Sequence, residues 1–188
     1  MNAKALVCAL LSVLISSAAE RLEVVICNTD HVPESVLASA ELNAGEIFRD
    51  IGVDVLWSSC TRWNASPSAE RLFILRIRSH TKPASRSGVL GMTYFSSGAP
   101  PVYADVYFDN VENLVSAYDV GPAQVAGYAI AHELGHLLLG PTHTGYGVMK
   151  AVWSGRDLRI MGHHGLTFDK AQRASIRRQL QVGVRGSP

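Results

Sequence analysis

The sequence has almost no excess of charge of either sign. Its 17 Lys and Arg residues stand against 16 Asp and Glu residues, so the formal net charge at pH 7 is +1. A chain balanced in this way creates no long-range field that would attract a nucleic acid or an anionic membrane surface. We therefore expect neither as a partner.

The N-terminus lacks an apolar run long enough to span a membrane. Residues 5–15 are almost wholly apolar, but a membrane-spanning helix needs about 20 such residues. Lys4 precedes this run and the small residues Ser17, Ala18 and Ala19 follow it, a pattern typical of a signal peptide. We expect residues 1–19 to be a signal peptide, residues 20–188 to form the mature domain, and the protein to be secreted or periplasmic. A membrane anchor is the alternative.

Cysteine is scarce, with three residues in the chain. Cys8 lies in the expected signal peptide, so only Cys27 and Cys60 remain after cleavage. In an oxidising compartment these two can pair and close a long loop. Two unpaired, buried thiols are the alternative, and the sequence leaves both open.

The length of 188 residues favours one compact domain. Hydrophobic residues make up 47% of the chain and charged residues 18%, which provides for one substantial core. A monomer is the default expectation. Strand patterns occur at residues 22–27, 53–57, 71–78, 89–95 and 103–108, and helix patterns at 33–51, 123–139 and 167–181. This order predicts an α+β domain with a four- or five-stranded sheet, a covering helix, and a C-terminal helix with Thr167 as its N-cap.

The helix expected at 123–139 carries the motif His132-Glu133-Leu134-Gly135-His136. Two histidines four residues apart lie on one face of a helix, where both can bind one metal ion. Glu133 is placed to reach a water molecule beside that ion without binding it, which is the arrangement of a hydrolytic site with a general base. Two exposed histidines and a surface glutamate are the alternative interpretation.

No glutamate follows Glu133 in the sequence. A catalytic zinc ion usually takes three protein ligands and keeps a fourth position open, so a downstream His or Asp must supply the third. The downstream candidates are His143, Asp157, His163, His164 and Asp169. His143 is favoured because Gly140 can end the helix and turn the chain back toward the metal, while His163 and His164 stay open as replacements.

The string HELGHLLLGPTH, followed by Gly147-Val148-Met149, resembles the metzincin clan of zinc endopeptidases, particularly its small matrixin-like members. Those enzymes carry HExxHxxGxxH and a methionine turn below the metal. This chain departs from the pattern by one extra residue before the glycine. The resemblance implies a single domain with a mixed, twisted sheet, in which the strand at 103–108 or its neighbour pairs with an extended substrate.

The resemblance also implies a role for each matching residue. It assigns His132, His136 and His143 as Zn²⁺ ligands, Glu133 as general base, Gly140 as the turn glycine and Met149 as the turn methionine. The expected function is thus an exported zinc endopeptidase that hydrolyses peptide or protein substrates with a zinc-activated water. A zinc-binding exported protein without peptidase activity, and an exported binding module with incidental histidines, are the alternatives.

Overall fold

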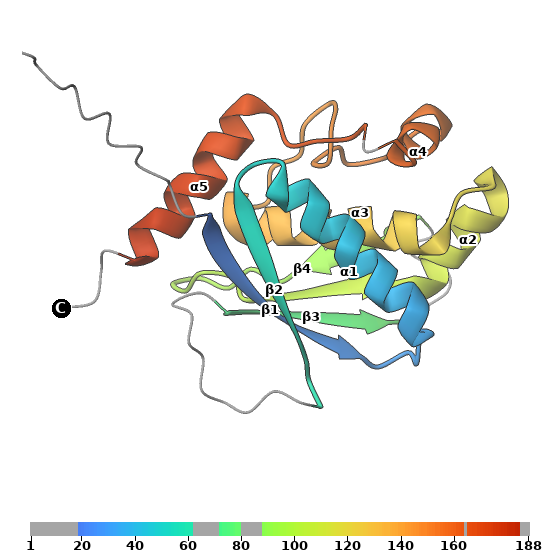
Figure 1. The fold of residues 1–188 in the computed structure, drawn as a ribbon, viewed down its shortest axis with the longest axis horizontal. Helices are drawn as coiled ribbons and strands as arrows, with labels where there is room; N and C mark the ends of the chain where they lie inside the picture. Colours follow the sequence, from blue (N-terminus) through green and yellow to red (C-terminus); the bar gives the residue numbers. More distant parts are fainter. Residues whose placement is uncertain (1–18, 62–71, 80–87, 164, 185–188) are drawn as a thin grey trace, which may run out of the picture.

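The computed structural model describes residues 19–61, 72–79, 88–163 and 165–184. Within these ranges five strands form one sheet and five helices accompany it (Figure 1). The strands are β1 (Glu20–Asn28), β2 (Val53–Ser59), β3 (Leu72–Arg78), β4 (Gly91–Thr93) and β5 (Tyr103–Tyr107). The helices are α1 (Glu34–Arg49), α2 (Phe108–Tyr118), α3 (Pro122–Leu139), α4 (Gly155–Met161) and α5 (Lys170–Val184).

The sheet has the strand order β2-β1-β3-β5-β4. Four strands are parallel, whereas β4 pairs with β5 in the antiparallel sense. The parallel pair β1 and β2 is joined through α1, because parallel neighbours need a crossover connection. β5 is therefore an inner strand, and β4 forms one edge of the sheet.

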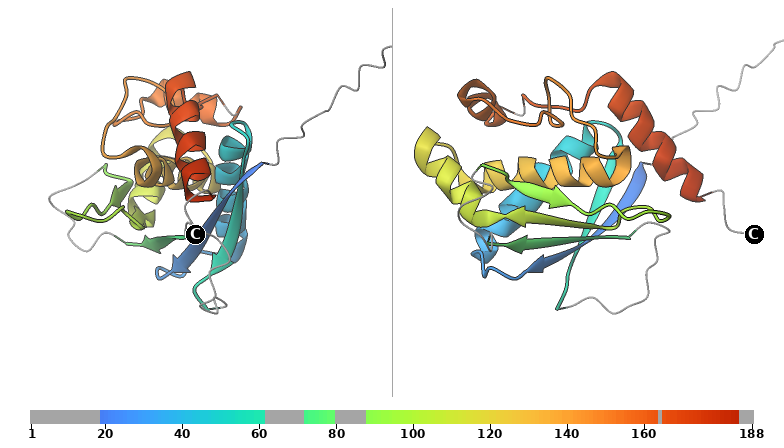
Figure 2. Two further views of the ribbon diagram at one scale, coloured as in Figure 1. Left: turned by 90° about the vertical axis from the view of Figure 1, so that its left-hand side faces the viewer. Right: turned by 180° about the vertical axis from the view of Figure 1, so that it is seen from behind.

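Helices α1 and α3 pack against each other and cover one face of the sheet (Figures 1 and 2). α1 lies beside β2, while α3 lies beside β4 and β5. Their close approach depends on Gly127, where a Cβ atom would lie 2.6 Å from Cβ of Asn43. The strands supply alternate residues to the shared core, as Phe73, Leu75 and Ile77 of β3 do.

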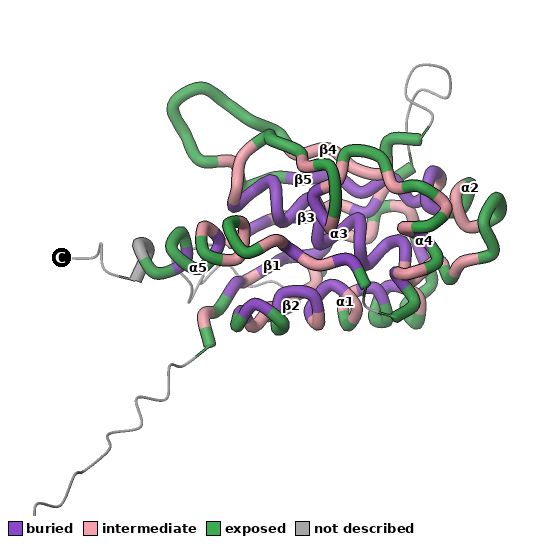
Figure 3. The backbone as a smooth tube through the Cα atoms, turned by 90° about the horizontal axis from the view of Figure 1, so that it is seen from above, coloured by how far each residue is buried: buried purple, intermediate pink, exposed green. Residues whose placement is uncertain are grey.

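The burial pattern marks α3 as the central helix of the domain. In Figure 3 most residues of α3 and of the inner strands are coloured as buried, whereas α5 is exposed along much of its length. Every residue of α3 from Val125 to Leu138 is buried, so this helix lies in the interior of the domain. No helix in the described ranges has the length and apolarity that a membrane crossing requires.

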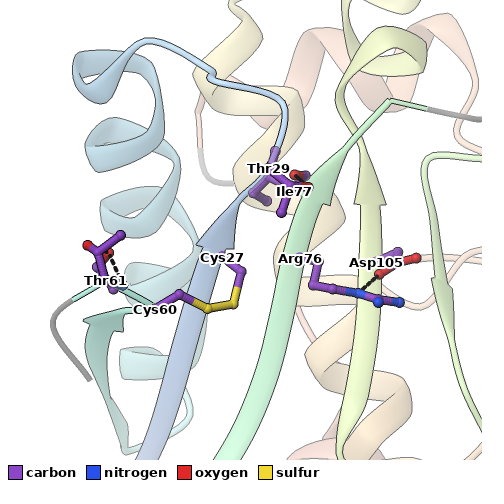
Figure 4. Close-up of a disulfide and its surroundings, with 8 residues drawn as sticks. Cys27, Thr29, Cys60, Thr61, Arg76, Ile77 and Asp105 are labelled. Carbon is purple, nitrogen blue, oxygen red and sulfur yellow. Dashed lines mark hydrogen bonds and ion pairs between the residues drawn. A yellow bond between two sulfur atoms is a disulfide. The ribbon is translucent and has the colours of Figure 1, made fainter. Parts of the chain in front are cut away.

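A disulfide joins Cys27 at the end of β1 to Cys60 just after β2 (Figure 4). Their Cα atoms lie 5.0 Å apart and the residues are separated by 33 positions in the sequence. The parallel pairing of β1 with β2 brings the two cysteines together. Of the two states that the sequence left open, the structure has the paired one.

The expected α+β fold with a mixed sheet of four or five strands is confirmed, with three differences in detail. Helices α2 and α4 were not predicted. Thr167 is not the N-cap of the last helix, because the side chain of Asp169 accepts a hydrogen bond from the backbone N–H of Gln172 at 2.8 Å. The side chain of Gln172 in turn accepts a hydrogen bond from the backbone N–H of Asp169, and the two bonds together form a capping box. The proposed signal peptide lies outside the described residues, apart from Ala19.

Candidate metal centre

Helix α3 begins after Gly121, with Pro122 in its first turn, and ends at Gly140. Proline suits this position because a backbone N–H in the first turn of a helix has no partner within the helix, so no hydrogen bond is lost when proline lacks it. Gly140 has φ 89° and ψ −172°, and its N–H donates to the carbonyl of His136 at 2.9 Å. A positive φ favours glycine, so Gly140 stops the helix and redirects the chain, as the sequence predicted.

The redirected chain brings three imidazole rings together. His132 and His136 have their Nε2 atoms 3.0 Å apart, and those of His136 and His143 are 3.1 Å apart. One ligand atom from each of the three lies within 4.8 Å of the others. The extra residue before Gly140 is accommodated because α3 continues to Leu139, and His143 still reaches the other two rings.

Of the other downstream candidates, those that the structure describes do not join this group. Among the described residues only the three histidines form a cluster that could hold a metal ion, and His163 is not part of it. Asp157 pairs with Lys150, and Asp169 caps α5. His164 lies outside the described residues.

Backbone carbonyls orient two of the rings. Nδ1 of His132 lies 2.8 Å from the carbonyl oxygen of Val148, and Nδ1 of His136 lies 2.8 Å from that of Gly140. Because a carbonyl can only accept, each Nδ1 carries the proton and each Nε2 presents a lone pair. Burial lowers the pKa of His132 to about 4 and also lowers the pKa of His136. Both rings are neutral at pH 7, as metal ligands must be.

This donor set fits a zinc ion. Three neutral imidazoles whose Nε2 atoms converge match the His₃ arrangement of zinc sites that keep a fourth position open. Imidazole nitrogen is a ligand that zinc favours, whereas magnesium and calcium prefer oxygen.

Glu133 lies beside the cluster with its side chain buried, at 4% relative exposure. Burial raises the pKa of its carboxyl group to about 7, and the hydrogen bond from Thr93 opposes that shift. The Thr93 hydroxyl donates to Oε2 of Glu133 at 2.7 Å. A carboxylate whose pKa lies near neutrality can both accept and release a proton.

The turn at 147–149 lies against the underside of α3. Met149 is fully buried, and a Cβ atom on Gly135 would collide with its Sδ. Gly147 has φ 73° and its position leaves no room for a side chain, since a Cβ atom would lie 2.5 Å from the carbonyl oxygen of Thr167. The same turn supplies the Val148 carbonyl that orients His132, so the methionine turn and the histidine cluster form one unit.

A cleft of about 620 Å³ opens beside the cluster. It is lined by the three histidines, by Glu133 and by the segment 88–93, which contains β4. Apolar residues, among them Leu114, Val152 and Trp153, also line it. The Trp153 ring meets the His132 ring nearly at a right angle, with centroids 5.7 Å apart. Tyr146 lies in a different hollow, with Ser154 and Arg156.

Comparison with known proteins bears on the fold. No protein-family model and no curated protein sequence matches the chain. Among solved structures, metalloproteinase-II from Bacteroides fragilis matches with a TM-score of 0.52 at 11% identity, over 86% of this chain and 53% of that chain. The chain shares its fold with a bacterial metalloproteinase. It spans about half the length of that protein. Archaemetzincin from Methanopyrus kandleri gives a TM-score of 0.47 at 13% identity, over 89% of this chain and 99% of that chain.

The structure places two further residues at the site that the sequence did not indicate. Thr93 and Gly91 of β4 both lie against the side chain of Glu133. They are about 40 positions away from it in the sequence, and neither belongs to a recognisable motif. A Gly-x-Thr on a short strand becomes informative only when the strand is known to lie beside α3.

Proposed function

We propose that the mature chain is a zinc-dependent endopeptidase with His132, His136 and His143 as metal ligands and Glu133 as general base. The observation that carries this proposal is the convergence of three Nε2 atoms beside a buried carboxylate, in residues that line an open cleft. Histidines with a purely structural role, in an ion pair or in the core, would need neither three converging Nε2 atoms nor a cleft beside them.

The chain's own groups divide the work of hydrolysis. A zinc ion held by the three histidines would acidify water and polarise a substrate carbonyl. Glu133 accepts the proton of the attacking water at its carboxylate and then delivers it to the leaving amine. Burial of the carboxyl group supports both transfers, because burial raises its pKa toward neutrality.

The substrate is a peptide or protein bound in extended form. β4 is an edge strand, and the segment that contains it lines the cleft. In the part of the chain that the structure describes, no strand pairs with the other side of β4, and that side can receive the backbone hydrogen bonds of an added strand. The sequence-based expectation gave this role to the strand at 103–108 or its neighbour. The inner position of β5 favours the neighbour, β4.

The proposal extends to the compartment and to the narrower family. Removal of residues 1–19 as a signal peptide would deliver the enzyme outside the cytoplasm, secreted or periplasmic. The disulfide between Cys27 and Cys60 supports such an oxidising compartment. The methionine turn at 147–149 supports a small matrixin-like member of the metzincin clan, in spite of the extra residue before Gly140.

The test is zinc content and casein cleavage measured on the same purified samples. The wild type should hold one zinc ion per chain and cleave casein. Glu133→Gln should keep the zinc and lose turnover, because it removes the base and no ligand. His143→Ala should lose or weaken both, while His163→Ala, outside the cluster, serves as the matched control.

Each alternative has its own outcome in this experiment. Stoichiometric zinc without hydrolysis that depends on Glu133 would identify a zinc-binding protein that is not a peptidase. A wild-type chain that is folded yet binds no zinc would identify a binding module with incidental histidines. Zinc binding that survives His143→Ala but not His163→Ala would overturn the ligand assignment.

A further inference from the structure

Thr93, the last residue of β4, reaches the side chain of Glu133. Its Oγ1 lies 2.7 Å from Oε2 of the carboxylate and 3.2 Å from the backbone carbonyl oxygen of the same residue. A threonine hydroxyl has one proton to donate, and the shorter contact to a charged acceptor is the stronger one. Thr93 therefore engages Oε2, and Oε1 is the oxygen that it leaves free.

Gly91 restricts the same carboxylate from a second point on β4. Residues 91 and 93 lie on one face of the strand, because side chains alternate along it. An added Cβ atom at position 91 would lie 2.5 Å from Oε1 of Glu133 and 2.6 Å from its Cγ. On this face the strand thus presents bare backbone at Gly91 and a hydroxyl at Thr93, and the Glu133 side chain lies against both.

Resting on the proposed function, we infer that Thr93 is a positioning residue that holds the carboxylate of Glu133 in its working orientation. Glutamate has several rotamers, and a base that occupies the wrong one cannot meet the attacking water. The hydroxyl holds Oε2, while the backbone at Gly91 lies against Oε1 and Cγ, so β4 restrains the side chain at two points. β4 is also the edge strand proposed to bind the substrate. Thr93 therefore fixes the position of the general base relative to the bound peptide.

The variants Thr93→Val and Thr93→Ser separate the hydroxyl from the shape of the side chain. Valine keeps the size and removes the donor, whereas serine keeps the donor. Thr29→Val is the matched control, since Thr29 donates an equally short bond of 2.7 Å, to the carbonyl of Ile77, at the end of β1 (Figure 4). Thr93→Ala repeats the loss of the hydroxyl if valine prevents folding.

Four quantities are measured on each variant: zinc content, kcat and KM on an internally quenched peptide, and the Glu133 orientation in a crystal structure. Thr93→Val should keep one zinc ion per chain and lower kcat about 10- to 100-fold, with KM little changed, because a misplaced catalytic group costs about that much. The Glu133 carboxylate should then occupy more than one orientation. Thr93→Ser and Thr29→Val should retain most of the wild-type kcat.

The outcomes keep this inference distinct from the proposed function. A Thr93→Val enzyme with wild-type kcat, or a Thr93→Ser enzyme as impaired as Thr93→Val, would overturn the positioning role alone. An ordered, unshifted Glu133 in the Thr93→Val crystal would also contradict it. A wild type without Glu133-dependent hydrolysis would overturn the proposed function and the positioning role together.

Discussion

Gly135 lies at the point where α3 passes over Met149. Glycine inside a helix normally destabilises it by about 0.5–1 kcal/mol relative to alanine. Here a Cβ atom would collide with Sδ of Met149 and approach Cε1 of Phe168 to 3.1 Å. The glycine is therefore required by the close contact between the helix and the methionine turn.

Gly135→Ala should destabilise the zinc-free protein by about 1–3 kcal/mol, the usual cost of adding a methyl group to a packed core. Gly45→Ala in α1 is the control, because the added Cβ atom would lie an ordinary 3.7 Å from Nε1 of Trp57. That substitution should be neutral or stabilising, by up to about 1 kcal/mol. Urea unfolding measures both. Equal effects of the two substitutions would contradict the role assigned to Met149.

Single residues differ in how far the sequence indicated them. His132, Glu133 and His136 stand within one helical turn, so the helical repeat alone brings them together. His143 could be predicted as a ligand because Gly140 precedes it, and a glycine with positive φ commonly ends a helix and turns the chain. Thr93 and Gly91 could not be found in this way, because their contact with Glu133 depends on which strand lies beside α3.

At the scale of elements, each of the two helices that were not predicted carries a signal: apolar residues at helical spacing in α2, and the capping-box sequence Ser154-x-x-Asp157 at the start of α4. However, α2 lacks the usual boundary residues and α4 is short. α2 begins directly after β5, with no turn residue between them, and ends at Asp119. Asp119 adopts φ 52°, the left-handed conformation that glycine usually supplies at a helix end. α4 has seven residues, too few for a periodic pattern to show. The long helices α1 and α3 had clear patterns and were predicted.

Helix α4 depends on a capping box formed by Ser154 and Asp157. The carboxylate of Asp157 accepts from the backbone N–H and hydroxyl of Ser154 and from Nζ of Lys150 at 2.5 Å. Burial raises the pKa of Asp157, but the hydrogen bonds from Lys150 and Ser154 outweigh it and lower the pKa to about 2. Lys150 also lines the cleft, so this cap fixes part of the cleft wall.

Asp157→Asn should lower the free energy of unfolding at pH 6 by about 1 kcal/mol, the typical worth of a helix cap. The folded pKa lies below the unfolded value, so the stabilisation is present above about pH 4 and is lost as the pH falls toward 2. The stability difference between wild type and variant should therefore shrink over that range. Thermal unfolding at several pH values measures it, and a difference independent of pH would contradict the role of the ionised carboxylate.

At the scale of the whole molecule, the order of strands was beyond the sequence. Alternation in the segment 72–78 predicted a strand with one buried face, but nothing local says that β3 lies between β1 and β5. The same limit applied to the cysteines, which meet because β1 and β2 are parallel neighbours. Long-range pairing decides both features, whereas local patterns decide only the elements.

The disulfide should contribute to stability mainly by restricting the unfolded chain. A closed loop of 33 positions corresponds to about 3–4 kcal/mol in the chain-entropy account. The double variant Cys27→Ser, Cys60→Ser should lose about that much in urea unfolding, and the reducing agent that destabilises the wild type should leave it unchanged. Neither cysteine lines the cleft, so the proposed peptidase activity should persist at 25 °C. A double variant as stable as the oxidised wild type would contradict this account.

A zinc ion at the proposed site would connect α3 to the loop that follows it, since His132 and His136 lie in the helix and His143 in the loop. A ligand that binds only the folded state stabilises it by about 2.7 kcal/mol at 100 times its Kd. For a domain of this size that raises Tm by roughly 5–10 °C. Zinc should therefore raise Tm over an EDTA-treated sample in the wild type and in Glu133→Gln alike, and much less in His143→Ala. An equal rise in His143→Ala would show that zinc stabilises the fold from another site, whereas a rise missing from Glu133→Gln would make that carboxylate a ligand and leave the reaction without its base.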